Sequence, residues 1–198
     1  MTARIDKAVV SGVFSLDGQD FDVDNNVWLV GDDDEVLVID APHRAEPIVA
    51  AIGGRRVRAI VLTHGHNDHI TAAVALREAT GAPIWLNPAD LGLWSAVHPE
   101  ALPDSAVGHC TPFSVAGTLL LSMHTPGHSP GGTSLYSRDL GAVFTGGTRP
   151  GAAGHSSPDA PTLRGSVRSC LLTLPADTVV KPGQGEDTTI AAEASRVR

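Results

Sequence analysis

The sequence predicts an α/β protein, and three observations lead to that prediction. Short runs rich in β-branched residues, bounded by turn formers, alternate with segments whose apolar residues recur at helical spacing. This layout of strands followed by helices occurs in both halves of the chain, without a repeat in the sequence itself. A cluster of histidines falls where a strand should end and a helix begin, which is where α/β folds place ligands.

The first half of the chain is expected to begin with strands. Apolar and β-branched residues dominate three runs, Val9–Leu16, Asn26–Val30 and Glu35–Ile39. Asp17-Gly18 and the acidic segment Gly31–Asp34 separate these runs and are typical of hairpin turns. The pattern predicts three strands joined by tight turns.

Helices are expected to enter after these strands. A helical stretch near Glu46–Ile52 ends at Gly53-Gly54, a usual signal for a helix stop. The compact apolar strand Arg58–Leu62 then runs directly into the segment 63–69, which holds three histidines. After this segment, Ile70–Ala79 has apolar residues at helical spacing and predicts a helix.

The second half repeats the arrangement with a weaker signal. The expected strands are short apolar runs at Pro83–Leu86, Thr118–Met123, Thr133–Tyr136, Ala142–Thr145 and Val179–Lys181. The expected helices lie at Pro88–Ala96, Thr162–Leu172 and Thr188–Val197. The glycine- and proline-rich stretch Gly146–Pro161 is expected to form a loop over or beside the site.

Length and composition favour a soluble globular protein with one domain over residues 1–198. The formal net charge of −8 argues against a nucleic-acid partner, which favours a basic face. No apolar run approaches the roughly 18 residues of a membrane-spanning helix, and Met1–Lys7 lacks the apolar core of a secretion signal. We therefore expect a cytoplasmic protein with a small-molecule substrate. The oligomeric state stays open, a homodimer included.

The segment His64-Gly65-His66-Asn67-Asp68-His69 has the character of a metal-binding turn. Alternate residues of an extended segment face the same side, so His64 and His66 can reach one ion together. A helix that begins at Asp68 turns its carboxylate and His69 toward the neighbouring space. So many candidate ligands on one strand-to-helix turn are hard to explain by core packing, and they predict a metal site.

These residues match the HxHxDH signature of the metallo-β-lactamase superfamily, and the resemblance is closest to its short glyoxalase II-like branch. The segment 124–132 resembles the family's TPGH turn, whose histidine, here His128, is the third ligand. Val36–Asp40 resembles the strand and aspartate that precede the first metal loop, and Val143–Thr148 and Val179–Thr189 occupy the places of two later motifs. The resemblance implies a four-layer αββα sandwich with the metal at one edge.

The same resemblance assigns roles to residues around the ligands. Asp40 is expected to orient a histidine ligand or the metal loop, with a plain strand-ending aspartate as the alternative. His124 lies in the TPGH-like turn but is expected to be structural. The remaining histidines have no motif around them and are also expected to be structural: His43, His98, His109 and His155.

Two positions depart from the family's two-metal pattern. The segment 144–148 reads FTGGT, with Gly147 in the place of the family's bridging aspartate. The segment 182–185 reads PGQG, with Gln184 in the place of a late histidine. Both missing groups belong to the second metal, and the aspartate is also shared with the first.

The ligands that remain favour one metal ion per chain. His64, His66 and His128 are three imidazoles, a known catalytic zinc arrangement with an open fourth position. Asp68 and His69 remain as ligands of the second site, and two ligands rarely hold zinc tightly. The expected cofactor is therefore one zinc ion, with iron or manganese as alternatives.

The resemblance implies a metal-dependent hydrolase of a small thioester, ester or lactone. Asp68 is the candidate catalytic base, because a carboxylate without a second metal can accept the proton of the attacking water. Gln184 and Arg149 are candidate substrate-binding residues, with an exposed surface arginine as the alternative for Arg149. Two other functions stay open: a repurposed biosynthetic enzyme with lyase, cyclising or oxidative chemistry, and a non-catalytic metal-binding descendant.

Overall fold

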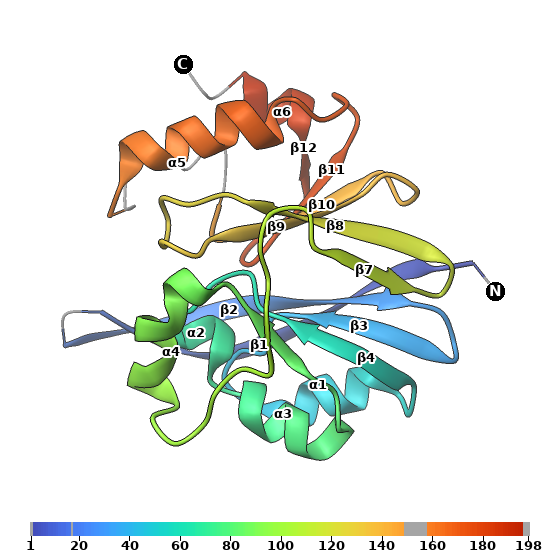
Figure 1. Ribbon diagram of the computed structural model, residues 1–198, viewed down its shortest axis with the longest axis vertical. Coiled ribbons are helices and arrows are strands. Elements are labelled where there is room, and N and C mark those ends of the chain that lie inside the picture. Colours follow the sequence, from blue (N-terminus) through green and yellow to red (C-terminus); the bar gives the residue numbers. More distant parts are fainter. Residues whose placement is uncertain (1, 17, 149–157, 196–198) are drawn as a thin grey trace.

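The computed structural model describes residues 2–16, 18–148 and 158–195. Its strands form two six-stranded sheets that pack face to face. Helices cover the outer face of each sheet, so that the molecule has four layers (Figure 1). The expected αββα sandwich is confirmed.

The first sheet is mixed and has the strand order β1-β2-β3-β4-β5-β6. Its strands are β1 (Arg4–Leu16), β2 (Gln19–Gly31), β3 (Glu35–Ile39), β4 (Arg56–Val61), β5 (Ile84–Leu86) and β6 (Ser105–Ala106). The first three strands pair antiparallel, and β3 to β6 pair parallel. The parallel strands need crossover segments, which the helices of this half supply.

The second sheet has the order β12-β11-β10-β9-β8-β7. Its strands are β7 (Pro112–Val115), β8 (Thr118–His124), β9 (Thr133–Ser137), β10 (Ala142–Gly146), β11 (Val179–Pro182) and β12 (Thr188–Thr189). Only β10 and β11 are parallel among the pairs of this sheet.

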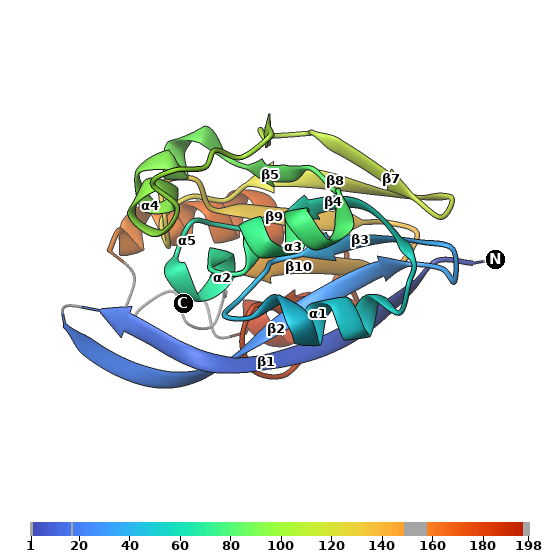
Figure 2. The ribbon, with the colours of Figure 1, turned by 90° about the horizontal axis from the view of Figure 1, so that it is seen from below.

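The helices divide between the two outer layers. Those of the first half are α1 (Ala45–Ile52), α2 (Asn67–Ile70), α3 (Ala73–Thr80), the 3₁₀ turn η1 (Pro88–Asp90) and α4 (Leu91–Val97). Those of the second half are α5 (Ala160–Ser166), the π-helical turn η3 (Val167–Leu171) and α6 (Ile190–Ala194). Figure 2 shows α1 and α3 lying across the first sheet. Within the described ranges, every helix is too short or too polar to cross a bilayer.

Strand β3 shows why the sheets are sandwiched between other layers. Val36 and Val38 face the core beneath the helices, whereas Leu37 and Ile39 face the second sheet and its Phe144. All five side chains are buried. A strand that is apolar on both faces must be covered on both faces, and each such side chain contributes about 1.5–3 kcal/mol relative to exposure.

The hairpin of β1 and β2 is longer than the sequence predicts. Strand β2 begins at Gln19 instead of Asn26. Residues 20–24 alternate aspartate with Phe21 and Val23 and are mostly exposed, so no continuous apolar run marks this part of the strand. The turn end of this hairpin extends past the rest of the sandwich (Figures 1 and 2). Side chains on both faces of the hairpin are exposed to solvent there, which explains why the sequence pattern for a strand is weak.

Short strands were also missed, and two helices differ from their expected limits. Strands β6 and β7 have only two and four residues. The expected helix Ile70–Ala79 is two pieces, α2 and α3. The expected helix Thr188–Val197 begins with a strand pair, because β12 adds to the edge of the second sheet before α6 starts.

Candidate metal centre

Two turns at one edge of the sandwich bring three histidines together. His64 and His66 lie between β4 and α2, and His128 lies between β8 and β9. One ring nitrogen from each side chain lies within 4.8 Å of the others, and the ring centroids are 4.6–4.8 Å apart. These residues are called the histidine triad below. The sequence separation of the two turns makes this convergence a property of the fold.

The hydrogen bonds of His64 leave one of its ring nitrogens available for a ligand. The Thr63 hydroxyl lies 2.9 Å from Asp40 Oδ2 and 3.0 Å from His64 Nδ1. Because the hydroxyl donates its proton to the carboxylate, it accepts the Nδ1–H of His64. The lone pair is then on Nε2, which is buried and has no hydrogen-bond partner among the described residues.

An unpaired buried acceptor is costly unless a ligand binds it. The same triad shows a second sign of a cation site, because His66 Nδ1 lies 3.1 Å from His128 Nε2. One ring nitrogen of each of the three histidines lies close enough to the others for all three to reach one ion. The residues present therefore fit a metal ion.

The electrostatics of the triad favour neutral rings. Burial and then the neighbouring imidazoles lower the pKa of His64 well below its ordinary value of 6.5. Burial lowers the pKa of His66 as well, although the Asp68 carboxylate opposes it. Burial and the neighbouring His66 lower the pKa of His128 to about 3. All three rings are thus neutral at neutral pH, the form that binds metals.

Asp40 orients the site, as the sequence predicts. It follows β3 in the left-handed region, at φ 65°, and is buried. Its Oδ1 accepts the backbone N–H of Thr63 at 2.8 Å. Its Oδ2 lies 2.8 Å from Nδ1 of His69. One carboxylate therefore holds both the start of the metal loop and a histidine of that loop.

His69 experiences opposing influences. Burial lowers its pKa, but the carboxylates of Asp40 and Asp68 raise it by more, so the net pKa lies above the ordinary value. The amide nitrogen of Asn25 lies 3.2 Å from Nε2 and works against protonation. Because an amide nitrogen only donates, it needs a lone pair on Nε2. The hydrogen-bonded arrangement is satisfied by a neutral ring whose Nδ1–H donates to Asp40.

Asp68 is buried next to the triad and is held by two amides. Asn25 Nδ2 and Gln184 Nε2 each donate to its Oδ2 at 3.0 Å. Its Oδ1 makes no hydrogen bond to any described residue. The predicted residues Asp68, His69 and Gln184 are therefore brought together, but as a hydrogen-bonded group beside the triad.

Asp90 links the two turns, and no motif in the sequence points to this role. It lies in η1, is fully buried, and accepts hydrogen bonds from both turns that carry the triad. Its Oδ2 accepts from Gly65 N at 2.8 Å and from Ser129 Oγ at 2.7 Å, while its Oδ1 accepts from Gly131 N at 2.6 Å. Asp90 thus sets the position of His66 relative to His128.

Gly147 leaves space that a ligand ring fills. A Cβ atom at this position would lie 2.1 Å from Cδ2 of His128. Any side chain at 147 therefore competes with the triad for the same volume. The missing bridging carboxylate and the position of His128 are physically coupled.

The hairpin also contributes to the surroundings of the triad. The Phe14 ring lies 6.3 Å from the ring of His66.

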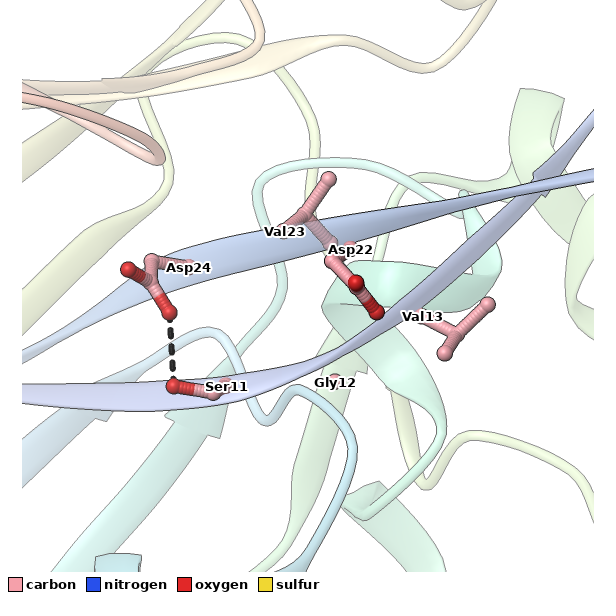
Figure 3. A pocket seen from close by; sticks show the side chains of 6 residues that line it. All are labelled: Ser11, Gly12, Val13, Asp22, Val23 and Asp24. Atoms are coloured by element: carbon pink, nitrogen blue, oxygen red, sulfur yellow. Dashed lines mark hydrogen bonds between the residues drawn. The ribbon is translucent and has the colours of Figure 1, made fainter.

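A cavity of about 350 Å³ lies on the same hairpin, where the Ser11 hydroxyl donates to Asp24 across the strands (Figure 3). It is lined by Ser11, Gly12, Val13, Asp22, Val23 and Asp24. None of the predicted ligands lines this cavity.

The remaining predicted residues divide into three cases. Arg149 and His155 lie outside the described residues. The Nε2 atoms of His124 and His98 each bond a backbone carbonyl, and Nδ1 of His109 accepts the backbone N–H of His124, in keeping with structural roles. His43 also has a structural role, because its Nε2 lies 2.9 Å from Oδ1 of Asn25, a residue that contacts Asp68.

The chain is similar in sequence and in structure to known proteins. Residues 21–180 match the family model described as the metallo-beta-lactamase superfamily. The chain belongs to the metallo-β-lactamase superfamily. The match includes both turns that carry the triad, and the family expected from the sequence is confirmed.

Two relatives of this metallo-β-lactamase-fold chain have names that describe hydrolases. It is 31% identical to the probable metallo-hydrolase YqgX of Bacillus subtilis, over 85% of this chain and 88% of that one. It is also 31% identical to the hydroxyacylglutathione hydrolase GloC of Haemophilus influenzae, over 85% and 89% of the two chains. The glyoxalase II-like resemblance is confirmed.

Solved structures support the same family. TTHA1623, crystallised in a di-iron-bound form, superposes with a TM-score of 0.73 at 31% identity, covering 87% of this chain and 93% of its own. The B3 metallo-beta-lactamase BLEG-1 gives a TM-score of 0.74 at 24% identity, over 94% and 97% of the two chains, and so shows the fold alone.

Proposed function

We propose that this chain is a metal-dependent hydrolase that uses one ion, zinc, at the histidine triad to cleave a small thioester, ester or lactone. The observation that carries the proposal is the convergence of three neutral imidazoles, one with a buried and unpaired Nε2. Three imidazoles with an open fourth position are a catalytic zinc arrangement. The hydrolase names of two relatives support the reaction class, and a cytoplasmic setting is part of the proposal.

The chain's own residues provide the groups that such a hydrolysis needs. When bound, the ion supplies Lewis acidity toward water and toward a carbonyl oxygen. Asp68 is held through Oδ2, so its Oδ1 is the atom that accepts a proton from the attacking water. Phe14 provides an apolar surface near His66 that suits an acyl group.

A substrate panel tests the reaction class. Purified protein, stripped of metal and reloaded with zinc, is assayed with acyl-glutathione thioesters, simple esters and lactones. We expect metal-dependent turnover of at least one class, lost on chelation. Because TTHA1623 carries iron, the iron-loaded form is assayed in parallel. Lack of activity with every substrate in both forms would contradict the proposal.

The substitution Asp68→Asn tests the proposed base. It keeps the shape of the side chain but removes the proton acceptor, so turnover should fall by about 10²–10⁴-fold. Metal content should stay near that of the wild type, because the triad is intact. Asp24→Asn on the hairpin is the matched control and should retain turnover. An equal loss of metal and turnover in Asp68→Asn would refute the role.

A further inference from the structure

Asn25 occupies a position in the site that the family pattern did not indicate. It lies in β2 and is fully buried. Its Nδ2 donates to Asp68 Oδ2 at 3.0 Å and lies 3.2 Å from His69 Nε2. These two residues are the ligands that remain of the family's second metal site. One amide group therefore uses both of its N–H bonds on the atoms that a second cation would need.

Gln184 approaches the same carboxylate from the other sheet. It follows β11, and its Nε2 donates to Asp68 Oδ2 at 3.0 Å. Its backbone forms an isolated antiparallel bridge with Asn25. The neighbouring Asn26 donates its backbone N–H to Gly183 O at 2.8 Å. The two amide side chains are thus fixed side by side by the backbone that carries them.

The orientation of the Asn25 amide follows from its neighbours. Asp68 accepts hydrogen bonds, so the nitrogen of the amide must face it and the oxygen must face away. The oxygen meets Nε2 of His43 at 2.9 Å. His43 has a φ of 51°, and its ring lies against Gly12, where a Cβ atom would come within 2.3 Å of Cγ. A packed ring therefore holds the amide in place.

We propose that Asn25 and Gln184 form an amide clamp that takes the place of the second cation and makes this a one-metal centre. The inference rests on the proposed function only in placing the first ion at the triad. The positive ends of three N–H bonds point at Asp68 and His69. A cation at the same point would face those hydrogens, so the second site is filled by donors and does not fit a metal.

The clamp and the mere absence of the late histidine predict different zinc contents once that histidine is restored. Restoring the late histidine with Gln184→His supplies a third ligand beside Asp68 and His69, but Asn25 still donates to both. This variant should therefore still bind about one zinc ion per chain. The double variant Asn25→Ala/Gln184→His has the same ligands without the Asn25 amide, and it should bind about two.

Zinc content after equilibrium dialysis against excess zinc measures both variants and the wild type. The expected zinc content is about one ion per chain for the wild type, about one for Gln184→His and about two for the double variant. Two ions in the wild type or in Gln184→His would overturn the clamp, and so would one ion in the folded double variant. Circular dichroism checks folding. If the alanine variant does not fold, Asn25→Ser/Gln184→His replaces it with the same expected value.

The readout separates the clamp from the proposed reaction. Zinc content requires no substrate, so a substrate panel without activity leaves the expected metal contents unchanged. Conversely, a two-ion wild type that hydrolyses a thioester would remove the clamp and keep the hydrolase. The two proposals can therefore fail independently.

Discussion

The histidine triad and the amide clamp lie next to each other and differ in how their polar atoms are satisfied. In the triad, Nε2 of His64 is buried without a partner among the described residues. In the clamp, Oδ2 of Asp68 accepts two amide N–H bonds and Nε2 of His69 faces a third. A ligand-type residue whose lone pair already faces a donor, such as His69, is therefore a weaker mark of a metal site than one without a donor, such as His64.

The largest expected effect contrasts a histidine of each group. His64→Asn and His69→Asn both keep a donor near the Nδ1 position, where Thr63 or Asp40 bonds the ring, and both remove Nε2. His64→Asn should lose its metal at zinc concentrations that saturate the wild type. His69→Asn should retain it. The measurement is zinc content after dialysis, and equal loss in both variants would erase the distinction.

The next effect concerns the carboxylate that joins the two turns. Asp90→Asn replaces an acceptor that faces Gly65, Ser129 and Gly131. Residues that orient ligands change metal affinity by about 10–100-fold, and we expect a loss of that size. Competition with a zinc chelator measures it.

The control for Asp90 is Asp104→Asn. Asp104 also accepts a backbone N–H, that of Ile84, but lies on β6's side of the first sheet and contacts no predicted ligand. The Asp104→Asn variant should have a lower free energy of unfolding than the wild type but the same zinc affinity. If both variants weaken zinc binding equally, Asp90 has no special role in joining the turns.

A smaller effect is expected at Gly147. The Cβ atom of Gly147→Ala would overlap the His128 ring, and overpacking costs about 1–3 kcal/mol. Both the thermal unfolding temperature of the metal-stripped protein and its affinity for zinc should decrease. Gly92→Ala, at a position with open space, is the control and should not weaken zinc binding. If Gly147→Ala keeps the unfolding temperature and the zinc affinity of the wild type, the His128 ring can move aside without loss, which contradicts the prediction.

The smallest effect is a pH dependence of the metal-stripped protein. The pKa values of the triad lie below 6.5 in the folded state, so the unfolded chain binds more protons as pH falls. The stability present above about pH 6.5 should therefore be lost toward pH 3. The raised pKa of His69 acts in the opposite direction, since its contribution is present below pH 6.5 and lost as pH rises through the raised value.

Denaturant unfolding of the stripped protein at about pH 5 and about pH 7 measures the balance of these groups. The pKa values of four histidines, the triad and His43, are lowered and that of His69 is raised, which predicts lower stability at the acidic pH. Higher stability at the acidic pH would mean that protonation of His69 dominates. The assignment of neutral, metal-binding rings to the triad would then be wrong.

The residues that could be predicted from the sequence are those in local patterns. His64 and His66 occupy alternate positions after a buried strand, and His128 lies in a recognisable turn. Strand β3 was predicted with its observed limits, because its apolar run is bounded by turn formers. Local signals of this kind survive in a single sequence.

The residues that were missed depend on tertiary contacts. Asn25, Asp90 and His43 have no neighbours in sequence that reveal a role, and each acts on a segment 18 or more residues away. The first part of β2, from Gln19 to Asp24, was missed because side chains on both of its faces are mostly exposed. Asn25, Asp90 and His43 have their roles because the tertiary fold brings them to the site, and no sequence motif marks them.

The central claim is that one cation is held by three imidazoles from two turns. Crystals of the zinc-loaded wild-type protein, measured at the zinc absorption edge, test it directly. We predict one anomalous peak, bounded by the rings of His64, His66 and His128, with the amides of Asn25 and Gln184 still on Asp68. An absent peak at that point, or a second peak between Asp68 and His69, would contradict the account.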